Sequence, residues 1–84
     1  MSESTQEITM YGAAWCSDCT RSKRVLDASG VDYRYVDLEA VPEAAAEALA
    51  ISGVKSIPVI VFPDGSHVVE PSDALLRERL DALV

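Results

Sequence analysis

Two cysteines separated by two residues are the feature that most constrains this chain. Cys16 and Cys19 are its only cysteines, and they lie where a short apolar stretch gives way to an amphipathic pattern. If Cys16 begins a helix, Cys19 lies one turn later on the same face. The two sulfurs can then close a small disulfide ring or open to a dithiol. A C-x-x-C motif at such a strand-to-helix junction, within a β-α-β pattern, indicates a redox site.

The start of a helix favours Cys16 as the reactive thiol. Free backbone N–H groups and the positive end of the helix dipole stabilise an anion there, and the thiolate is the nucleophilic form of cysteine. We expect Cys19 to be less exposed and to act as the resolving thiol. Asp18 opposes a negative sulfur by like-charge repulsion, whereas the basic residues that follow favour it, and Arg21 can pair with Asp18 at i, i+3. The sequence leaves the balance of these charges open.

Two other roles for the cysteine pair have less support. A structural disulfide across so short a spacing closes a very small loop and gains little chain entropy. A zinc site needs about four ligands, mostly nitrogen or sulfur. Beyond the cysteines the chain offers only His67, with carboxylates as a fallback, and we expect His67 to be a solvated strand residue. We therefore predict no metal site.

Size and charge limit the classes of function. The 84 residues predict a single domain over 1–84, without linker or repeat. The formal net charge of −7 argues against nucleic acid and anionic membranes as partners. The polar start of the chain, with a frayed end expected over residues 1–6, does not resemble a signal peptide. No apolar run approaches the roughly 20 residues that span a bilayer. We expect a cytoplasmic protein with a catalytic disulfide.

The hydrophobic pattern predicts seven elements. We expect strands over residues 7–11, 31–38, 59–62 and 67–69, and helices over residues 16–29, 42–50 and from about 72 onwards. The residues expected to face the core on the helices are Ser22, Val25, Leu26 and Ser29, then Ala45, Ala48 and Leu49, then Leu76, Leu80 and Leu83. The order β-α-β-α-β-β-α predicts an α/β domain with helices packed on a four-stranded mixed sheet.

Local signals mark the connections. Gly30 is a good C-terminal stop for the first helix, and a loop is expected over residues 51–57. Residues 63–66 form a strong turn motif, so the short strand that follows is expected at the sheet edge. Ser72 is a plausible N-cap of the last helix, and Asp73 suits its first turn. Tyr33 and Tyr35 share one strand face and are interpreted as packing residues.

This order of elements, with the stretches Trp15–Cys19 and Ser56–Pro58, resembles the glutaredoxin group of the thioredoxin fold over nearly the whole chain. Within that group the chain is most similar to the short mycoredoxins of mycothiol-using bacteria. The stretches that carry this closer similarity are Thr9-Met10-Tyr11 leading to Trp15-Cys16, the Ile57-Pro58 turn, and Asp64-Gly65-Ser66 followed by Pro71-Ser72.

The resemblance implies a substrate site around the cysteines. It implies that Pro58 is cis and faces the Cys16 sulfur, and that the backbone of Ile57 pairs with the peptide-like part of a thiol substrate, as an added strand would. The start of the last helix would lie beside that substrate's carboxylate or sugar. The substrate-binding residues expected on this basis are Trp15, Ser17, Asp18, Ile57, Pro58, Pro71, Ser72 and Asp73.

The chain also departs from ordinary glutaredoxins. It has Asp18 where they carry tyrosine, small residues over 12–14 where they have a basic residue, and Glu70-Pro71 where they have a Gly-Gly pair. These changes weaken the case for glutathione and leave another low-molecular-weight thiol, or a protein substrate, open. The redoxins that feed ribonucleotide reductase usually carry a Trp-Ser-Gly-Phe-like segment before the last helix, which this sequence lacks.

The leading hypothesis is a glutaredoxin-like thiol–disulfide oxidoreductase of mycoredoxin type. Cys16 would attack mixed disulfides between protein cysteines and a small thiol, with mycothiol as the expected cosubstrate and no permanently bound cofactor. Cys19 would be dispensable or modulatory, and the protein would be a monomer. One alternative is a dithiol electron carrier that needs both cysteines, is reduced by a flavin reductase and docks on proteins. Another is an iron–sulfur cluster held between two chains by Cys16 and two small thiols.

Overall fold

Strand β1 (Ile8–Gly12) lies inside a four-stranded sheet and leads directly to the cysteine motif. The computed structural model describes residues 7–83, so the prediction for residues 1–6 lies outside it. The remaining elements are α1 (Ser17–Ser29), β2 (Tyr33–Asp37), α2 (Ala44–Ser52), β3 (Val59–Val61), β4 (His67–Val69) and α3 (Asp73–Asp81). The predicted order of elements is confirmed.

The sheet is mixed, as predicted. Its strand order is β2-β1-β3-β4, with β1 parallel to β2 and antiparallel to β3, and β3 antiparallel to β4. Because β1 and β2 are parallel neighbours, α1 is the crossover between them. Strand β4 lies at the edge, as expected, and the turn before it is closed by the Phe62 N–H, which donates to the Ser66 carbonyl at 2.8 Å.

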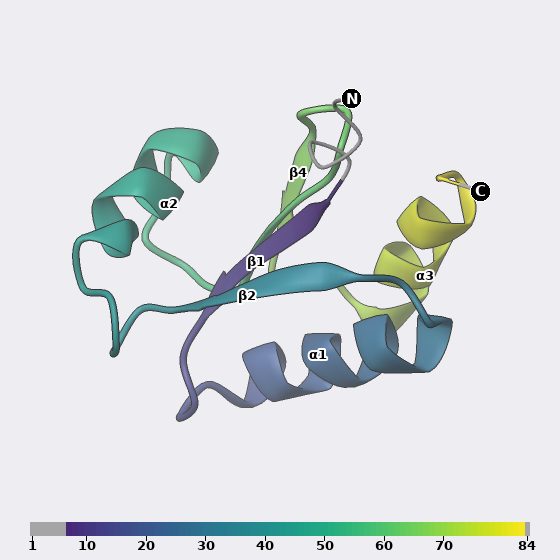
Figure 1. The fold of residues 1–84 in the computed structure, drawn as a ribbon, viewed down its shortest axis with the longest axis horizontal. Coiled ribbons are helices and arrows are strands. Elements are labelled where there is room, and N and C mark those ends of the chain that lie inside the picture. Colours follow the sequence, from purple (N-terminus) through teal and green to yellow (C-terminus); the bar gives the residue numbers. More distant parts are fainter. Residues whose placement is uncertain (1–6, 84) are drawn as a thin grey trace.

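Helices cover both faces of the sheet (Figure 1). On one face α1 and α3 pack together, and Met10, Leu26 and Leu76 are fully buried in the core they share with the sheet. On the other face α2 packs against Tyr11 and Val59. Successive residues of a strand point to opposite faces, so Met10 and Tyr11 serve the two different cores.

Helix α2 is the element that the sequence placed least well. It begins at Ala44, after a turn at Pro42 and Glu43, and it extends to Ser52. Its buried residues are Ala44 and Ala48, so the predicted burial of Ala45 and Leu49 is wrong. A run of alanines carries little amphipathic signal, so the sequence indicates only weakly which of them face the sheet; Ala48 is buried as predicted, and Ala44, at i and i+4 with it, lies on the same face.

Smaller differences occur at the other helix ends. Ser29 is exposed, and its hydroxyl donates to the Val25 carbonyl at 2.8 Å, so its predicted place in the core is wrong. Leu83 is exposed because α3 ends at Asp81, whereas Leu76 and Leu80 are buried as predicted. Gly30 ends α1 with a φ of 73°, which glycine adopts without steric cost.

None of the helices within residues 7–83 has the length and apolar character needed to cross a membrane.

Candidate active site

Cys16 occupies the N-cap position of α1. Its backbone is extended, and its Sγ accepts a hydrogen bond from the Cys19 N–H at 3.2 Å. The thiol of Cys16 also lies 3.9 Å from the carbonyl oxygen of Ile57. An N–H aimed at the sulfur from the start of a helix stabilises negative charge there. The geometry therefore fits the predicted role of Cys16 as the nucleophile.

Cys19 lies deeper in the fold, as expected. Both cysteines are free thiols, but Cys19 is 1% exposed and Cys16 is 8% exposed. Burial raises the pKa of the Cys19 thiol, and its hydrogen bond with Cys16 adds to this shift. Cys19 is therefore a protonated thiol over a wide pH range, which suits a resolving or modulatory group better than an attacking one.

The loop before β3 forms a second wall of the site. The Ile57–Pro58 peptide bond is cis, as the resemblance implied. Pro58 is buried, and Ile57 is the residue of the pair that lines the pocket beside Cys16. This arrangement brings the segment before β3 to the start of α1, although the two segments are far apart in the sequence.

A pocket of about 400 Å³ opens at Cys16. It is lined by Trp15, Cys16, Ser17, Asp18, Lys55, Ser56, Ile57 and Glu70. Trp15 is 71% exposed, so most of its side chain is accessible to a bound group at the edge of the pocket. The pocket brings together five of the predicted site residues, namely Trp15, Cys16, Ser17, Asp18 and Ile57.

The start of α3 is not part of this lining. Pro71 is buried, and the Ser72 hydroxyl caps α3 by accepting from the Leu75 N–H at 3.1 Å. Asp73 pairs with Arg21, whose Nε lies 3.1 Å from the Asp73 Oδ1. Substrate contacts by Pro71, Ser72 and Asp73 therefore stay a prediction. In the structure Ser72 caps α3, and Asp73 joins α3 to α1.

Arg21 joins the cysteine motif to α3 through two carboxylates. Its Nη1 lies 3.0 Å from the Asp18 Oδ1, which confirms the predicted pairing. The negative charge of Asp18 beside the cysteines is thus offset locally.

Lys23, another of the basic residues after the motif, lies over the Tyr35 ring at 4.1 Å from its centroid. Burial raises the pKa of Tyr35, with Asp37 as the next cause.

Three lining residues were not predicted. Ser56 belongs to the Ser-Ile-Pro segment that carried the resemblance, so a sequence signal for it existed. Lys55 directly precedes that segment, and nothing else in the sequence indicated that Lys55 lines the pocket. Glu70 lines the pocket from the turn between β4 and α3, where its φ is 48°. Its sequence signal was the departure at Glu70-Pro71 from the Gly-Gly pair of ordinary glutaredoxins, which marked the position without predicting that Glu70 lines the pocket.

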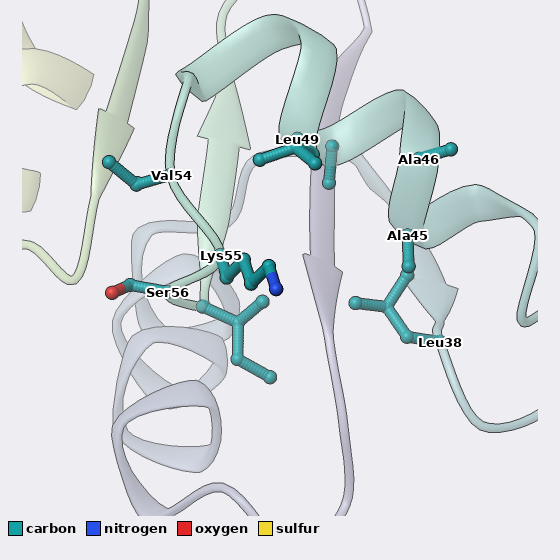
Figure 2. Close-up of a pocket in the computed structure, with 9 residues that line it drawn as sticks. Leu38, Ala45, Ala46, Leu49, Val54, Lys55 and Ser56 are labelled. Carbon is teal, nitrogen blue, oxygen red and sulfur yellow. The ribbon is translucent and has the colours of Figure 1, made fainter.

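An apolar groove of about 280 Å³ adjoins the Cys16 pocket. Lys55, Ser56 and Ile57 line both hollows. The far side of the groove is formed by Leu38 and α2, and Figure 2 shows Lys55 extending across it from the segment that precedes β3. Leu49, which the sequence analysis placed in the core, lies on this groove and is 40% exposed.

The fold and the site together define a thiol–disulfide oxidoreductase of the thioredoxin fold. A family model described as Glutaredoxin matches residues 8–68. A Mycobacterium tuberculosis protein assigned to the glutaredoxins is 32% identical over 77 residues, which cover 90% of this chain and 92% of that protein. The chain therefore belongs to the glutaredoxin family.

Solved structures agree with this assignment. The glutaredoxin from Archaeoglobus fulgidus has a TM-score of 0.78 and 28% identity, with 95% of each chain covered. The glutaredoxin-like NrdH-redoxin from Escherichia coli has a TM-score of 0.71 and 29% identity, covering 86% of this chain and 92% of that one. That redoxin is described as having a thioredoxin-like activity profile.

Proposed function

We propose that this protein reduces mixed disulfides between protein cysteines and a low-molecular-weight thiol, with Cys16 as the only essential thiol. The observation that carries the proposal is the bond from the Cys19 N–H to the Cys16 Sγ at 3.2 Å, beside an open pocket. This bond prepares one sulfur for attack without using the second thiol. The 400 Å³ pocket leaves room for a small-thiol group next to that sulfur.

The proposed reaction has two exchange steps. The Cys16 thiolate attacks the small-thiol sulfur of the mixed disulfide, so a Cys16–small-thiol disulfide forms. The target cysteine leaves as a thiolate and takes a proton from solvent. A second small thiol then attacks the Cys16 adduct, which releases the oxidised small-thiol dimer and restores the Cys16 thiolate. Each step exchanges one disulfide for another, so the target sulfur is reduced at the expense of the one small thiol that enters in the second step.

We propose mycothiol as the small thiol. The departures at Asp18 and Glu70-Pro71 from the pattern of ordinary glutaredoxins support a cosubstrate other than glutathione. The proposal includes no permanently bound cofactor, a monomeric protein, and a cytoplasmic location. Its partners are proteins that carry mixed disulfides, and neither nucleic acid nor membrane is among them.

The second candidate is a dithiol electron carrier reduced by a flavin reductase. Its support is the similarity to the Escherichia coli NrdH-redoxin, which is described by a thioredoxin-like activity profile, and the closeness of the two cysteines across one hydrogen bond. In this reading Cys19 attacks the Cys16–target disulfide, so both thiols are required.

Turnover on a protein–mycothiol mixed disulfide tests the choice. The electron source is mycothiol, glutathione or a thioredoxin-type reductase with NADPH, and the proteins are the wild type, Cys19→Ser and Cys16→Ser. Turnover with mycothiol that Cys19→Ser retains and Cys16→Ser loses supports the first candidate. Turnover only with the reductase, and only with both cysteines, supports the second. Activity in Cys16→Ser would refute both.

A further inference from the structure

Glu70 has an unusual backbone conformation at the edge of the Cys16 pocket. Within residues 7–83 it is the only residue other than glycine with a positive φ, at 48°. Its N–H donates to the Pro58 carbonyl at 2.9 Å, and the following Pro71 is buried, so the turn is held from both sides. Non-glycine residues in this region carry strain and concentrate at functional sites, which directs attention to the Glu70 side chain.

The side chain of Glu70 adds a negative charge to the pocket. Glu70 and Asp18 are the two carboxylates in its lining. Asp18 is paired with Arg21 at 3.0 Å, so its charge is offset. Glu70 forms no ion pair with any other residue in the part of the chain that the structure describes. Among residues 7–83, Glu70 is therefore the carboxylate of this pocket lining that has no ion-pair partner.

Lys55 is the cation in the same lining. Figure 2 shows its side chain reaching across the adjoining apolar groove, towards the side formed by Leu38 and Ala45. The charges of the site are thus divided between two segments, with the Lys55 ammonium on the loop before β3 and the Glu70 carboxylate on the turn after β4. Because both residues line the Cys16 pocket, Glu70 and Lys55 should act in opposite directions on the charge of a small group bound there.

We propose that Glu70 is a specificity-determining residue for the mixed disulfides that Cys16 attacks. It favours small-thiol groups that are cationic or neutral near the sulfur and disfavours those with a carboxylate there. The inference rests on the proposed function, because it requires the small-thiol group to occupy the Cys16 pocket during exchange. The step itself is the first exchange written above, in which one disulfide is replaced by another and no net oxidation occurs.

Two nearly isosteric probes test the inference. One cysteine-containing peptide is prepared as its mixed disulfide with cysteamine or with 3-mercaptopropionate, which place an ammonium or a carboxylate at a similar distance from the sulfur. The second-order rate constant for each probe is measured with reduced protein in a Cys19→Ser background, where the Cys16 adduct persists. The quantity compared is the ratio of the cationic to the anionic rate constant. The net charge of −7 alone favours the cationic probe, so only changes of this ratio are informative.

Glu70→Gln should lower the ratio about threefold to tenfold, since it removes one of the charges that line the pocket. Glu70→Gly should lower it similarly, and it also accepts the positive φ, which guards against a folding defect. Lys55→Gln should raise the ratio. The matched control is Glu78→Gln on α3, an exposed position outside the pocket lining, which makes the same change in net charge and should leave the ratio unchanged. All shifts should shrink at about 1 M salt, where the screening length is about 3 Å.

The inference is overturned if both Glu70 variants keep the ratio within twofold of their parent, or if Glu78→Gln lowers it as much as Glu70→Gln does. Intact-mass analysis separates this result from failure of the proposed function. A cysteamine or mercaptopropionate adduct on Cys16 with an unchanged ratio rejects only the role of Glu70. Absence of either adduct on Cys16, with the peptide attached there instead, rejects the small-thiol route itself.

Discussion

The backbone N–H of Cys19 donates to the Sγ of Cys16 at 3.2 Å, and the same contact caps helix α1. The donor belongs to the peptide unit, so it stabilises a negative Cys16 sulfur whatever side chain residue 19 carries. Helix capping and thiol activation are therefore one interaction. The Cys19 side chain is a separate element, buried and protonated, that the cap does not need.

Alkylation by iodoacetamide should modify Cys16 and spare Cys19 at neutral and mildly alkaline pH. The thiolate is the reacting form, and burial raises the pKa of Cys19, which keeps that thiol protonated as the pH rises. Mass spectrometry of the folded protein should give one adduct, on Cys16, and Cys16→Ser should give none. In denaturant both cysteines should react. Equal labelling of the two cysteines in the folded wild type would contradict this assignment.

Arg21→Gln should slow the alkylation of Cys16 about twofold to fivefold at low salt. Without its partner at 3.0 Å, the Asp18 carboxylate disfavours negative charge on the neighbouring sulfur. The double variant Arg21→Gln with Asp18→Asn should return the rate towards that of the wild type. Arg24→Gln, on the exposed side of the same helix, is the matched control and should change the rate less.

Arg21→Gln should have little effect on the free energy of unfolding. All three side chains of the Asp18–Arg21–Asp73 cluster are more than a third exposed, so we expect a loss below about 1 kcal/mol in the free energy of unfolding. A larger loss in urea unfolding would show that the link between α1 and α3 is structural, and it would weaken any interpretation of the rate change as electrostatic.

Much of this fold was predictable because its signals are local. Gly30 ends α1, Ser72 caps α3 and the turn at residues 63–66 closes a hairpin, each by contacts within a few residues. Helix α2 differs because almost any face of Ala44–Ala46 is apolar. Its orientation comes from distant contacts, including the Tyr11 hydroxyl, which donates to the Glu47 carboxylate at 2.8 Å.

The candidate site likewise combines residues that have local sequence signals with a residue that distant contacts place there. Cys16 and Asp18 lie in the motif itself, and Ile57 lies in the segment that carried the family resemblance. Glu70 enters the pocket through a backbone conformation fixed by its bond to the Pro58 carbonyl. The departure from the Gly-Gly pair of ordinary glutaredoxins marks Glu70 in the sequence, but no pattern within either segment encodes that bond or places Glu70 in the pocket lining.

Leu76→Ala should destabilise the protein by about 2–5 kcal/mol, because it removes a fully buried side chain and leaves a cavity between α3, α1 and the sheet. Leu75→Ala is the matched control, since Leu75 is the adjacent residue and is 40% exposed. Its loss should stay below about 1 kcal/mol. Midpoints of urea unfolding measure both. Similar losses for the two variants would mean that α3 is rotated relative to the structure described.

Stability should fall as the pH rises from about 10 to about 12, and Tyr33 should account for part of the fall. Burial, followed by the hydrogen bond that its hydroxyl donates to Asp27 at 2.8 Å, raises the pKa of Tyr33 to about 12. In the unfolded chain tyrosine ionises near pH 10. Between these values the folded state holds more protons than the unfolded state, so the free energy of unfolding decreases with pH.

Tyr33→Phe should make this decrease shallower, because phenylalanine has no proton to lose in either state. Urea unfolding at a series of alkaline pH values measures the slope for each protein. Some slope should remain, since the pKa values of Tyr35 and Cys19 are also raised, in both cases chiefly by burial. Asp27→Asn is the companion variant, because it keeps the phenol and removes the charged acceptor. If Tyr33→Phe gave a slope parallel to that of the wild type, the contact between Tyr33 and Asp27 would not hold the phenolic proton in solution.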